Sequence, residues 1–220
     1  INNLRYPATI YESMNIYVNY ATGDDGSEVY NGAVFATIQG VANALPKFLN
    51  GQQVFIYLQN NTTENIEFRW FTSGNIYLML GGYTVYGHIR AYNISGSFLI
   101  YGGSRTDDTS TYATIHPSIG FPCGSRTTSI AIERCTYAAI YYLNVYAADN
   151  QYGNYTYDKV CVGLDGGAKA FADQIKIYNT DIGFRTYITS QLHIQRSYGI
   201  AKVHGHQALL GGIISLANGS

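Results

Sequence analysis

The chain has 220 residues and a mass of 24.3 kDa, enough for one domain with a substantial hydrophobic core. Its 13 Lys and Arg against 14 Asp and Glu give a formal charge of -1, which argues against a basic stripe for nucleic acid and a polybasic membrane contact. No apolar run approaches the roughly 20 residues of a membrane-spanning helix. We therefore expect no nucleic-acid partner and no membrane insertion.

The first elements in chain order are a strand, a loop and a helix. Alternation over residues 16–18 predicts a strand, and a polar, Gly-containing loop follows over 22–32. Apolar side chains then recur at helical spacing: Phe35, Ile38, Val41, Ala42 and Leu45. Pro46 ends this predicted helix, because proline lacks an amide hydrogen and clashes with the preceding turn.

Short β-like runs make up most of the remaining chain. The 22 Tyr and 24 Gly, with only 12% charged residues, favour strands and turns. Apolar runs separated by Gly, Asn and Ser predict strands at 54–58, 66–70, 76–80, 85–92, 97–101, 129–133, 139–146 and 159–162. Two polar segments, near 103–127 and 147–158, interrupt the pattern and are expected to be loop insertions.

An internal repeat is visible in the C-terminal third. The pattern Gln-apolar-x-apolar begins at Gln174, Gln191 and Gln207, spaced 17 and 16 residues apart. A period this short holds a few strands and turns but no helix, so it predicts a β-solenoid of stacked coils. The three glutamines would then form a hydrogen-bonded ladder. The alternative is that the three matches arise by chance among β-strands.

We expect a single domain over residues 1–220. Residues 1–50 would hold the first strand and the helix, and residues 51–216 would hold the coils. The chain opens without Met, which indicates a fragment of a longer chain or a cleaved product.

Several segments resemble phage and prophage tail proteins of the pectin-lyase-like superfamily. The resemblance covers residues 14–102 and 166–216 and is carried by the strand at 16–18, the helical stretch 35–46, the strand at 54–58 and the segments 74–78, 86–93 and 199–214. It implies a right-handed parallel β-helix whose N-terminal end is covered by the amphipathic helix. It also implies a homotrimeric tail fibre or spike on the virion that engages the host surface.

Aromatic side chains are candidates for sugar binding. Tyr makes up a tenth of the chain, more than a core needs, and rigid amphipathic rings give contact area at low entropic cost. The glycan-binding candidates are Tyr141, Tyr142, Tyr152, Tyr155, Tyr157 and Trp70. The alternative is that these rings pave strand faces or subunit contacts.

Three aspartates are weaker, catalytic candidates. Glycan hydrolysis needs two carboxylates flanking one bond, and Asp165, Asp173 and Asp181 form the densest acidic group. With a 16-residue repeat, Asp165 and Asp181 would stack on neighbouring coils and perturb each other's pKa. The alternative is that these side chains cap turns.

No metal and no cofactor are expected. The histidines closest in the repeat are His193, His204 and His206, but the repeat does not align them, so we expect them to face solvent. The three cysteines, Cys123, Cys135 and Cys161, lack metal-binding spacing and are interpreted as small apolar core residues. A disulfide between Cys123 and Cys135 is the alternative.

The sequence thus predicts an all-β fold, a single-stranded parallel β-helix (solenoid) with one N-terminal amphipathic capping helix. The predicted function is a receptor-binding and structural module of a phage tail fibre or spike that recognises a bacterial cell-surface polysaccharide, on the virion or otherwise extracellular. The first alternative is a polysaccharide-degrading lyase or glycoside hydrolase of the β-helix type. The second is a purely structural trimeric spacer or decoration protein.

Overall fold

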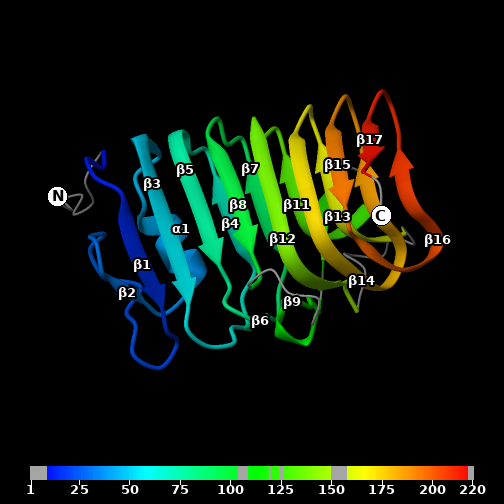
Figure 1. The fold of residues 1–220 in the computed structure, drawn as a ribbon. Coiled ribbons are helices and arrows are strands. Elements are labelled where there is room, and N and C mark those ends of the chain that lie inside the picture. The colour runs from blue at the N-terminus through cyan, green and yellow to red at the C-terminus, as the bar shows by residue number, and fades with distance from the viewer. Residues whose placement is uncertain (1–8, 104–108, 119, 124–125, 150–157, 218–220) are drawn as a thin grey trace.

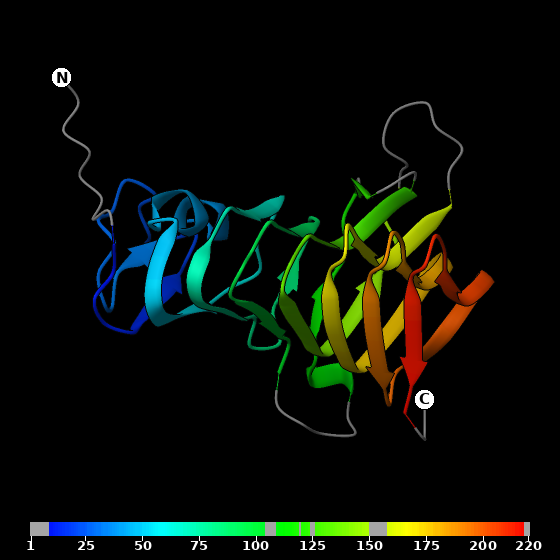
Figure 2. The same cartoon turned by 90° about the horizontal axis from the view of Figure 1, so that it is seen from above.

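The fold is all-β and elongated. The structure, a computed structural model, describes residues 9–103, 109–118, 120–123, 126–149 and 158–217. Strands β1 (Met14–Val18) and β2 (Val34–Phe35) lie at one end of the molecule, and β16 (Tyr198–Ala208) and β17 (Ile213–Leu216) lie at the other (Figure 1). The same order is visible from above (Figure 2). The expected all-β class is confirmed.

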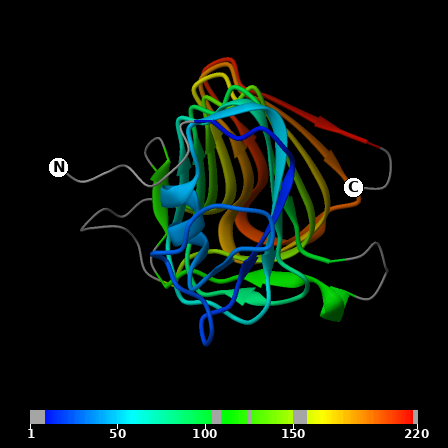
Figure 3. The ribbon, with the colours of Figure 1, turned by 90° about the vertical axis from the view of Figure 1, so that its left-hand side faces the viewer.

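Parallel pairings arrange the strands in three columns along the long axis. The first column contains β1, β3 (Phe48–Leu58), β5 (Thr72–Met79), β8 (Ser97–Tyr101), the start of β12 (Tyr137–Tyr146), the start of β14 (Lys169–Thr186), β15 (Gln191–Gln195) and β17. The second contains β4 (Ile66–Arg69), β7 (Ile89–Tyr92), β11 (Arg126–Glu133), β13 (Lys159–Asp165) and the ends of β14 and β16. The third contains β6 (Thr84–Val85), β9 (Ala113–Ile115) and the remaining parts of β12, β14 and β16. Seen along the axis, the columns surround a common interior (Figure 3).

The commonest offset between successive strands of a column is 22 residues. In the first column Val54 pairs with Ile76 and Ile76 with Phe98, while the Ser97 amide donates to Asn75 Oδ1 across the same 22-residue step. The same offset returns near the C-terminus, where Leu192 pairs with Ala170 and with Ile214. The offset is larger where residues are inserted, as between Phe98 and Ala138.

Interior positions of the paired strands form continuous apolar stacks. One stack in the first column consists of Ile16, Ile56, Leu78, Ile100, Ile140, Ala172 and Ile194, all fully buried. Burying one such Ile or Leu side chain contributes about 1.5–3 kcal/mol. The stacks are therefore the main source of stability.

The predicted 16–17-residue repeat is wrong, and so is the glutamine ladder built on it. Gln191 lies opposite Lys169 and Ile213, and Gln207 lies opposite Arg185. Gln174 lies at a bend of β14 with a positive φ of 54°. The repeated Gln-apolar-x-apolar pattern is a chance match among β-strands, because pairing is set by the 22-residue step.

The predicted helix is confirmed in a shorter form. Within the described residues the α-helix is α1 (Ile38–Ala44), capped by the Thr37 hydroxyl, which accepts from the Gly40 amide at 2.8 Å. Phe35, expected within the helix, instead belongs to β2. Helix α1 packs on β4, the first strand of the second column.

Every predicted strand has a counterpart, whereas the first predicted insertion contains regular secondary structure among its described residues. The segment 103–127 contains a 3-10 helix, η1 (Thr109–Thr111), together with β9 and β10 (Phe121–Cys123). Strand β10 pairs antiparallel with β11, the exception among the described pairings. The second insertion, 147–158, lies mostly outside the described residues.

The two cysteines with described side chains are buried, free thiols. Cys135 and Cys161 both lie in the core, where burial raises their pKa values to about 11 and about 12. Their interpretation as apolar core residues is confirmed. The Cys123 side chain lies outside the described part of the structure.

Candidate functional site

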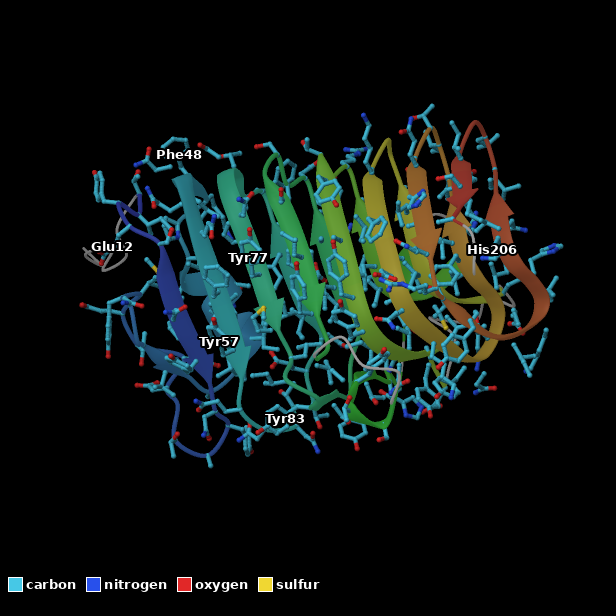
Figure 4. All side chains as sticks on the ribbon, viewed as in Figure 1. Glu12, Phe48, Tyr57, Tyr77, Tyr83 and His206 are labelled. Carbon is cyan, nitrogen blue, oxygen red and sulfur yellow. The ribbon has the colours of Figure 1, made fainter. Side chains whose placement is uncertain are left out.

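Aromatic side chains line the outward side of the first column. Strand residues alternate between interior and outward positions, so Tyr57 of β3 and Tyr77 of β5 point away from the core while their neighbours are buried. Figure 4 shows both on the same side of the molecule. We call the following half-buried residues the aromatic face: Tyr17, Phe55, Tyr57, Tyr77, Met79, Tyr101, Tyr141 and Phe171.

Rings of the aromatic face stack in register along the column. Centroid distances between directly paired rings are 4.5 Å for Phe55 and Tyr77, 4.7 Å for Tyr101 and Tyr141, and 5.5 Å for Tyr17 and Tyr57. These distances follow the spacing of about 4.8 Å between neighbouring strands. The rings are thereby held as a rigid, ordered surface.

A hollow of about 530 Å³ opens on this surface. Tyr57, Met79 and Tyr101, which pair in sequence along the column, form one wall. Gly81 and Gly103, in the turns that leave β5 and β8, also line the hollow, together with Thr111.

The aromatic face is uncharged from β1 to β12. The outward polar positions beside the rings carry amides and hydroxyls, as at Asn15, Gln53, Asn75 and Ser97. Charge first appears on β14, where buried Asp173 follows Tyr141 in the column and pairs with Arg196. Neutral hydrogen-bonding groups between rings suit ligands rich in hydroxyl groups.

Packing on the face raises the pKa of two of its phenols. Burial is the main cause for both Tyr101 and Tyr141, with neighbouring tyrosines adding to it, and the pKa of Tyr141 reaches about 12. Both hydroxyls therefore stay protonated at neutral pH. They can donate a hydrogen bond as well as accept one.

The structure places two of the predicted tyrosines together. Tyr141 belongs to the aromatic face, and the adjacent Tyr142 occupies the bend of β12 with a φ of 57°. Its ring lies 5.9 Å from that of Tyr141 and 5.8 Å from that of Tyr112. The other predicted tyrosines, Tyr152, Tyr155 and Tyr157, lie outside the described residues.

Trp70, the remaining glycan-binding candidate, projects from the turn after β4. Its φ of 65° and its 57% exposure show that the backbone turns the indole outward. The equivalent turns of later strands hold Asn93, Arg134 and Gly166, which also have positive φ values. The indole meets the Tyr92 ring edge-on at 5.3 Å.

Beside Trp70 lies a polar cleft of about 570 Å³ between α1 and β4. Gln39 fixes one wall, because its Oε1 accepts from the Glu67 amide at 2.6 Å and its Nε2 donates to Asn43 Oδ1 at 2.8 Å. Lys47 and Arg69 line the cleft, and the pKa of Lys47 is lowered by burial and by the nearby guanidinium. This second surface is separate from the aromatic face and has a mixed charge.

An ion-pair row joins three strands of the second column. Arg90 of β7 donates to both Glu133 carboxylate oxygens at 3.0 and 3.1 Å, and its other nitrogen lies 3.4 Å from Glu67. Half-buried and bidentate, this row is a stronger contact than an exposed pair. Its role is to fix β4, β7 and β11 in register.

The three candidate aspartates do not converge. The Asp165 carboxylate accepts from the Gly166 amide at 2.6 Å, and that of Asp181 accepts from the Lys159 amide at 2.9 Å. Asp165 ends β13 and Lys159 begins it, so these two carboxylates lie about 20 Å apart at 3.3 Å per residue. The predicted stacking of Asp165 on Asp181 is therefore wrong, because the strand position opposite Leu164 is Thr186.

The histidines are also spread over the C-terminal strands. His193 pairs with Ser215, and its Nδ1 lies 2.9 Å from the Ser215 hydroxyl. His204 and His206 follow Ile182 and Phe184 in the second column. Among the described residues no group of three or more His, Cys, Asp or Glu is arranged to hold a metal ion. Nor does that part of the chain contain a helix long and apolar enough to cross a membrane.

Sequence reasoning missed most of the aromatic face, although a signal was present. Phe55 and Tyr77 are separated by the 22-residue step, and so are Tyr57, Met79 and Tyr101. A search of the sequence for aromatic residues spaced 22 apart would have found these members of the aromatic face. The sequence analysis, based on a 16–17-residue repeat, instead predicted binding tyrosines in and beside the central insertion.

Comparisons with family models, curated proteins and solved structures give no match for this chain. The functional argument therefore rests on the geometry of the chain itself.

Proposed function

We propose that the chain is a single-stranded parallel β-helix capped at its N-terminal end by α1. The 22-residue step shared by the columns supports this architecture, since each step returns the chain to the same column one strand further along. The position of α1 on β4 supports the cap.

On this scaffold, we propose that the aromatic face binds polysaccharide. The observation that carries the proposal is the uncharged row of stacked, half-exposed rings around the hollow of Tyr57, Met79 and Tyr101. Aromatic faces stack on the apolar faces of sugars, and the phenol hydroxyls pair with sugar hydroxyls. An extended glycan could follow the column, since equivalent rings recur along it.

The biological setting that we propose is a phage tail fibre or spike, as a homotrimer on the virion, with bacterial cell-surface polysaccharide as the partner. It rests on the resemblance of the sequence to phage tail proteins. Binding without cleavage is preferred, because Asp165, Asp173 and Asp181 each have a local partner and lie apart.

The test is retention of the purified chain on immobilised bacterial surface polysaccharides, with fragment release assayed in parallel. We expect retention on at least one glycan, with affinity reduced about tenfold by Tyr57→Ala or Tyr101→Ala, a change worth about 1.4 kcal/mol. Tyr86→Ala is the control, because Tyr86 is an exposed tyrosine that lies outside the aromatic face.

Each other result has a distinct meaning. Released fragments would overturn binding alone in favour of a lyase or hydrolase. Unchanged retention of both tyrosine variants would remove the aromatic face from the proposal. If the variants instead dissociate an oligomer without affecting retention, the face is a subunit contact and the spacer alternative gains support.

A further inference from the structure

The polar cleft between α1 and β4 is a second surface that can hold a ligand. Both elements lie behind β3 and β5 in the view of Figure 1. The cleft has a volume of about 570 Å³, and its lining combines Trp70 with two cations, one carboxylate and three amide side chains. The polysaccharide site proposed above uses none of these residues.

The amide side chains offer hydrogen-bond donors to this cleft. Gln39 Oε1 accepts from the Glu67 amide, which orients its Nε2 to donate to Asn43 Oδ1 at 2.8 Å. Asn65 Oδ1 accepts from the His88 amide at 3.3 Å. The amide oxygens are therefore engaged, whereas within the described part of the chain neither Asn43 Nδ2 nor Asn65 Nδ2 donates to a protein acceptor. Such a set of donors suits a ligand rich in oxygen acceptors.

The cleft also has one more cation than carboxylate. Arg69 pairs with Glu67, a carboxylate that Arg90 contacts as well at 3.4 Å. Lys47 Nζ donates to the Ala42 carbonyl at 3.0 Å, and among the residues that the structure describes it has no carboxylate partner. Burial and the charge of Arg69 lower the pKa of Lys47. A bound anion would relieve the repulsion between these two cations.

Aromatic rings beside the cations favour a sugar over a free anion. Trp70 is 57% exposed, and its indole contacts Tyr92, whose hydroxyl accepts from Arg134 at 3.2 Å. Tyr92 and Arg134 line a neighbouring hollow of about 280 Å³. An oligosaccharide that extends from the cleft across Trp70 would reach this hollow. Asp165 also lines the hollow, so an acidic group belongs in the cleft of Lys47.

We propose that the cleft binds a saccharide that carries an oxyanion, either a carboxylate or a phosphate. Trp70 stacks on the apolar face of a sugar ring. Lys47 and Arg69 bind the oxyanion, and the amides of Asn43 and Asn65 donate to its oxygens or to those of the sugar. The proposal is independent of the aromatic face, which is uncharged from β1 to β12.

The first test uses the fluorescence of Trp70, the single tryptophan of the chain. The purified protein is titrated with a glucuronate tetrasaccharide, with a glucose tetrasaccharide that carries one phosphate, and with the neutral glucose tetrasaccharide. We expect a saturable change with at least one acidic tetrasaccharide and at least tenfold weaker binding of the neutral one. Binding of the acidic ligand should weaken at high salt, because exposed ions are screened.

Other ligands show whether both parts of the saccharide are recognised. Acetate or inorganic phosphate that binds as tightly as the acidic tetrasaccharide would overturn the proposal, because the sugar would then contribute nothing. Tighter binding of adenosine monophosphate or of a glutamate tetrapeptide would also overturn it. So would equal binding of the neutral tetrasaccharide, or a Trp70 signal that no ligand changes.

An isosteric pair of variants locates the oxyanion. Asn43→Asp should weaken binding of the acidic tetrasaccharide at least tenfold while the fold is retained, because a carboxylate replaces an exposed donor of the cleft. Asn31→Asp is the matched control, since Asn31 is also exposed and its Oδ1 also accepts within the protein, from the Asn15 amide, but it does not line the cleft. Equal affinities of the two variants would contradict the proposal.

The two proposed sites can fail separately. Tyr57→Ala should leave the Trp70 titration unchanged, whereas Lys47→Met should weaken it and leave retention on a neutral polysaccharide unchanged. Loss of the Trp70 titration in Tyr57→Ala would show that the cleft does not act as a site of its own. Retention on neutral polysaccharide without any Trp70 response would remove the cleft and keep the aromatic face.

Discussion

Tyr141 shows how the column sets the chemistry of a single residue. Its ring lies between the paired strands that carry Tyr101 and Phe171, with centroids at 4.7 and 5.8 Å. Each neighbouring ring excludes water from the phenol of Tyr141. The charged phenolate loses more solvation free energy by this than the neutral phenol does. The raised pKa of Tyr141 is thus a direct consequence of strand stacking.

The alkaline titration of Tyr141 follows from this packing. Burial raises its pKa from 10.0 to about 12 in the folded state, so folding favours the neutral phenol. This contribution to stability is complete below pH 10 and is lost as the pH rises through about 12. NMR of tyrosine labelled at the hydroxyl-bearing ring carbon should show Tyr141 titrating at higher pH in the folded than in the urea-unfolded protein. Tyr141→Phe assigns the signal, and a Tyr141 signal that titrates alike in both states would contradict the stacked geometry.

At the scale of an element, the turns between columns impose unusual backbone conformations. The turns at Gly166-Gly167, Ile188-Thr189 and Leu210-Gly211 are successive copies, 22 residues apart, and both residues of each have positive φ. Glycine adopts this region freely, whereas a β-branched residue is strained there by about 1–2 kcal/mol. Two of the three turns place glycine at the second position, and the middle one places Thr189 there.

Thr189→Gly should therefore stabilise the protein. Thr189 has a φ of 57° and an exposed side chain, so little packing is lost. We expect a gain of about 1 kcal/mol, visible as a rise in Tm of roughly 2–4 °C for a chain of this size. Thr189→Ala keeps the left-handed strain and should give no gain. A glycine variant that melts at or below the wild-type temperature would show that the turn is not strained as described.

The same elements explain what the sequence could and could not predict. Strands such as β3 and β5 were predictable because their interior and outward residues alternate. The 22-residue period could not be recognised in the sequence, because an interior stack accepts any apolar residue. Val54, Ile76 and Phe98, for example, occupy one stack and are three different residue types. Insertions such as the one between β8 and β12 then break the even spacing.

The candidate site was predictable only in part for the same reason. Tyr141 and Trp70 were found because tyrosines cluster near the central insertion and the tryptophan is single. Tyr57, Met79 and Tyr101 come together only once the register is known, since each belongs to a different strand. The ion pair between Arg90 and Glu133 likewise joins residues 43 apart in the sequence.

At the scale of the whole molecule, the proposed β-helix would consist of stacked steps, of which those of 22 residues are equal in length. The strand segment from Gln191 to Gln195 lies in register on the segment from Lys169 to Asp173, which precedes it in the first column. Each step contacts mainly its two neighbours, so stability should be close to a sum over steps. Removing one whole step should leave a folded, shorter molecule.

Deleting residues 169–190, which is one 22-residue step, tests this architecture directly. The deletion joins Ala168 to Gln191, so that Leu192 and Ile194 replace Ala170 and Ala172 above Ala138 and Ile140, and the interior positions of the first column remain apolar. We expect a soluble protein with cooperative unfolding and a denaturant m-value lower by roughly a tenth, in proportion to the shorter chain.

Deleting residues 169–185 is the matched control, because it removes the step that the glutamine pattern suggested. That deletion would place Tyr187 and Thr189 at the interior positions of Ala170 and Ala172 and bury unsatisfied polar groups, so it should not fold. The opposite result, with the shorter deletion folded and the longer one insoluble, would be incompatible with the 22-residue register and with the aromatic face that depends on it.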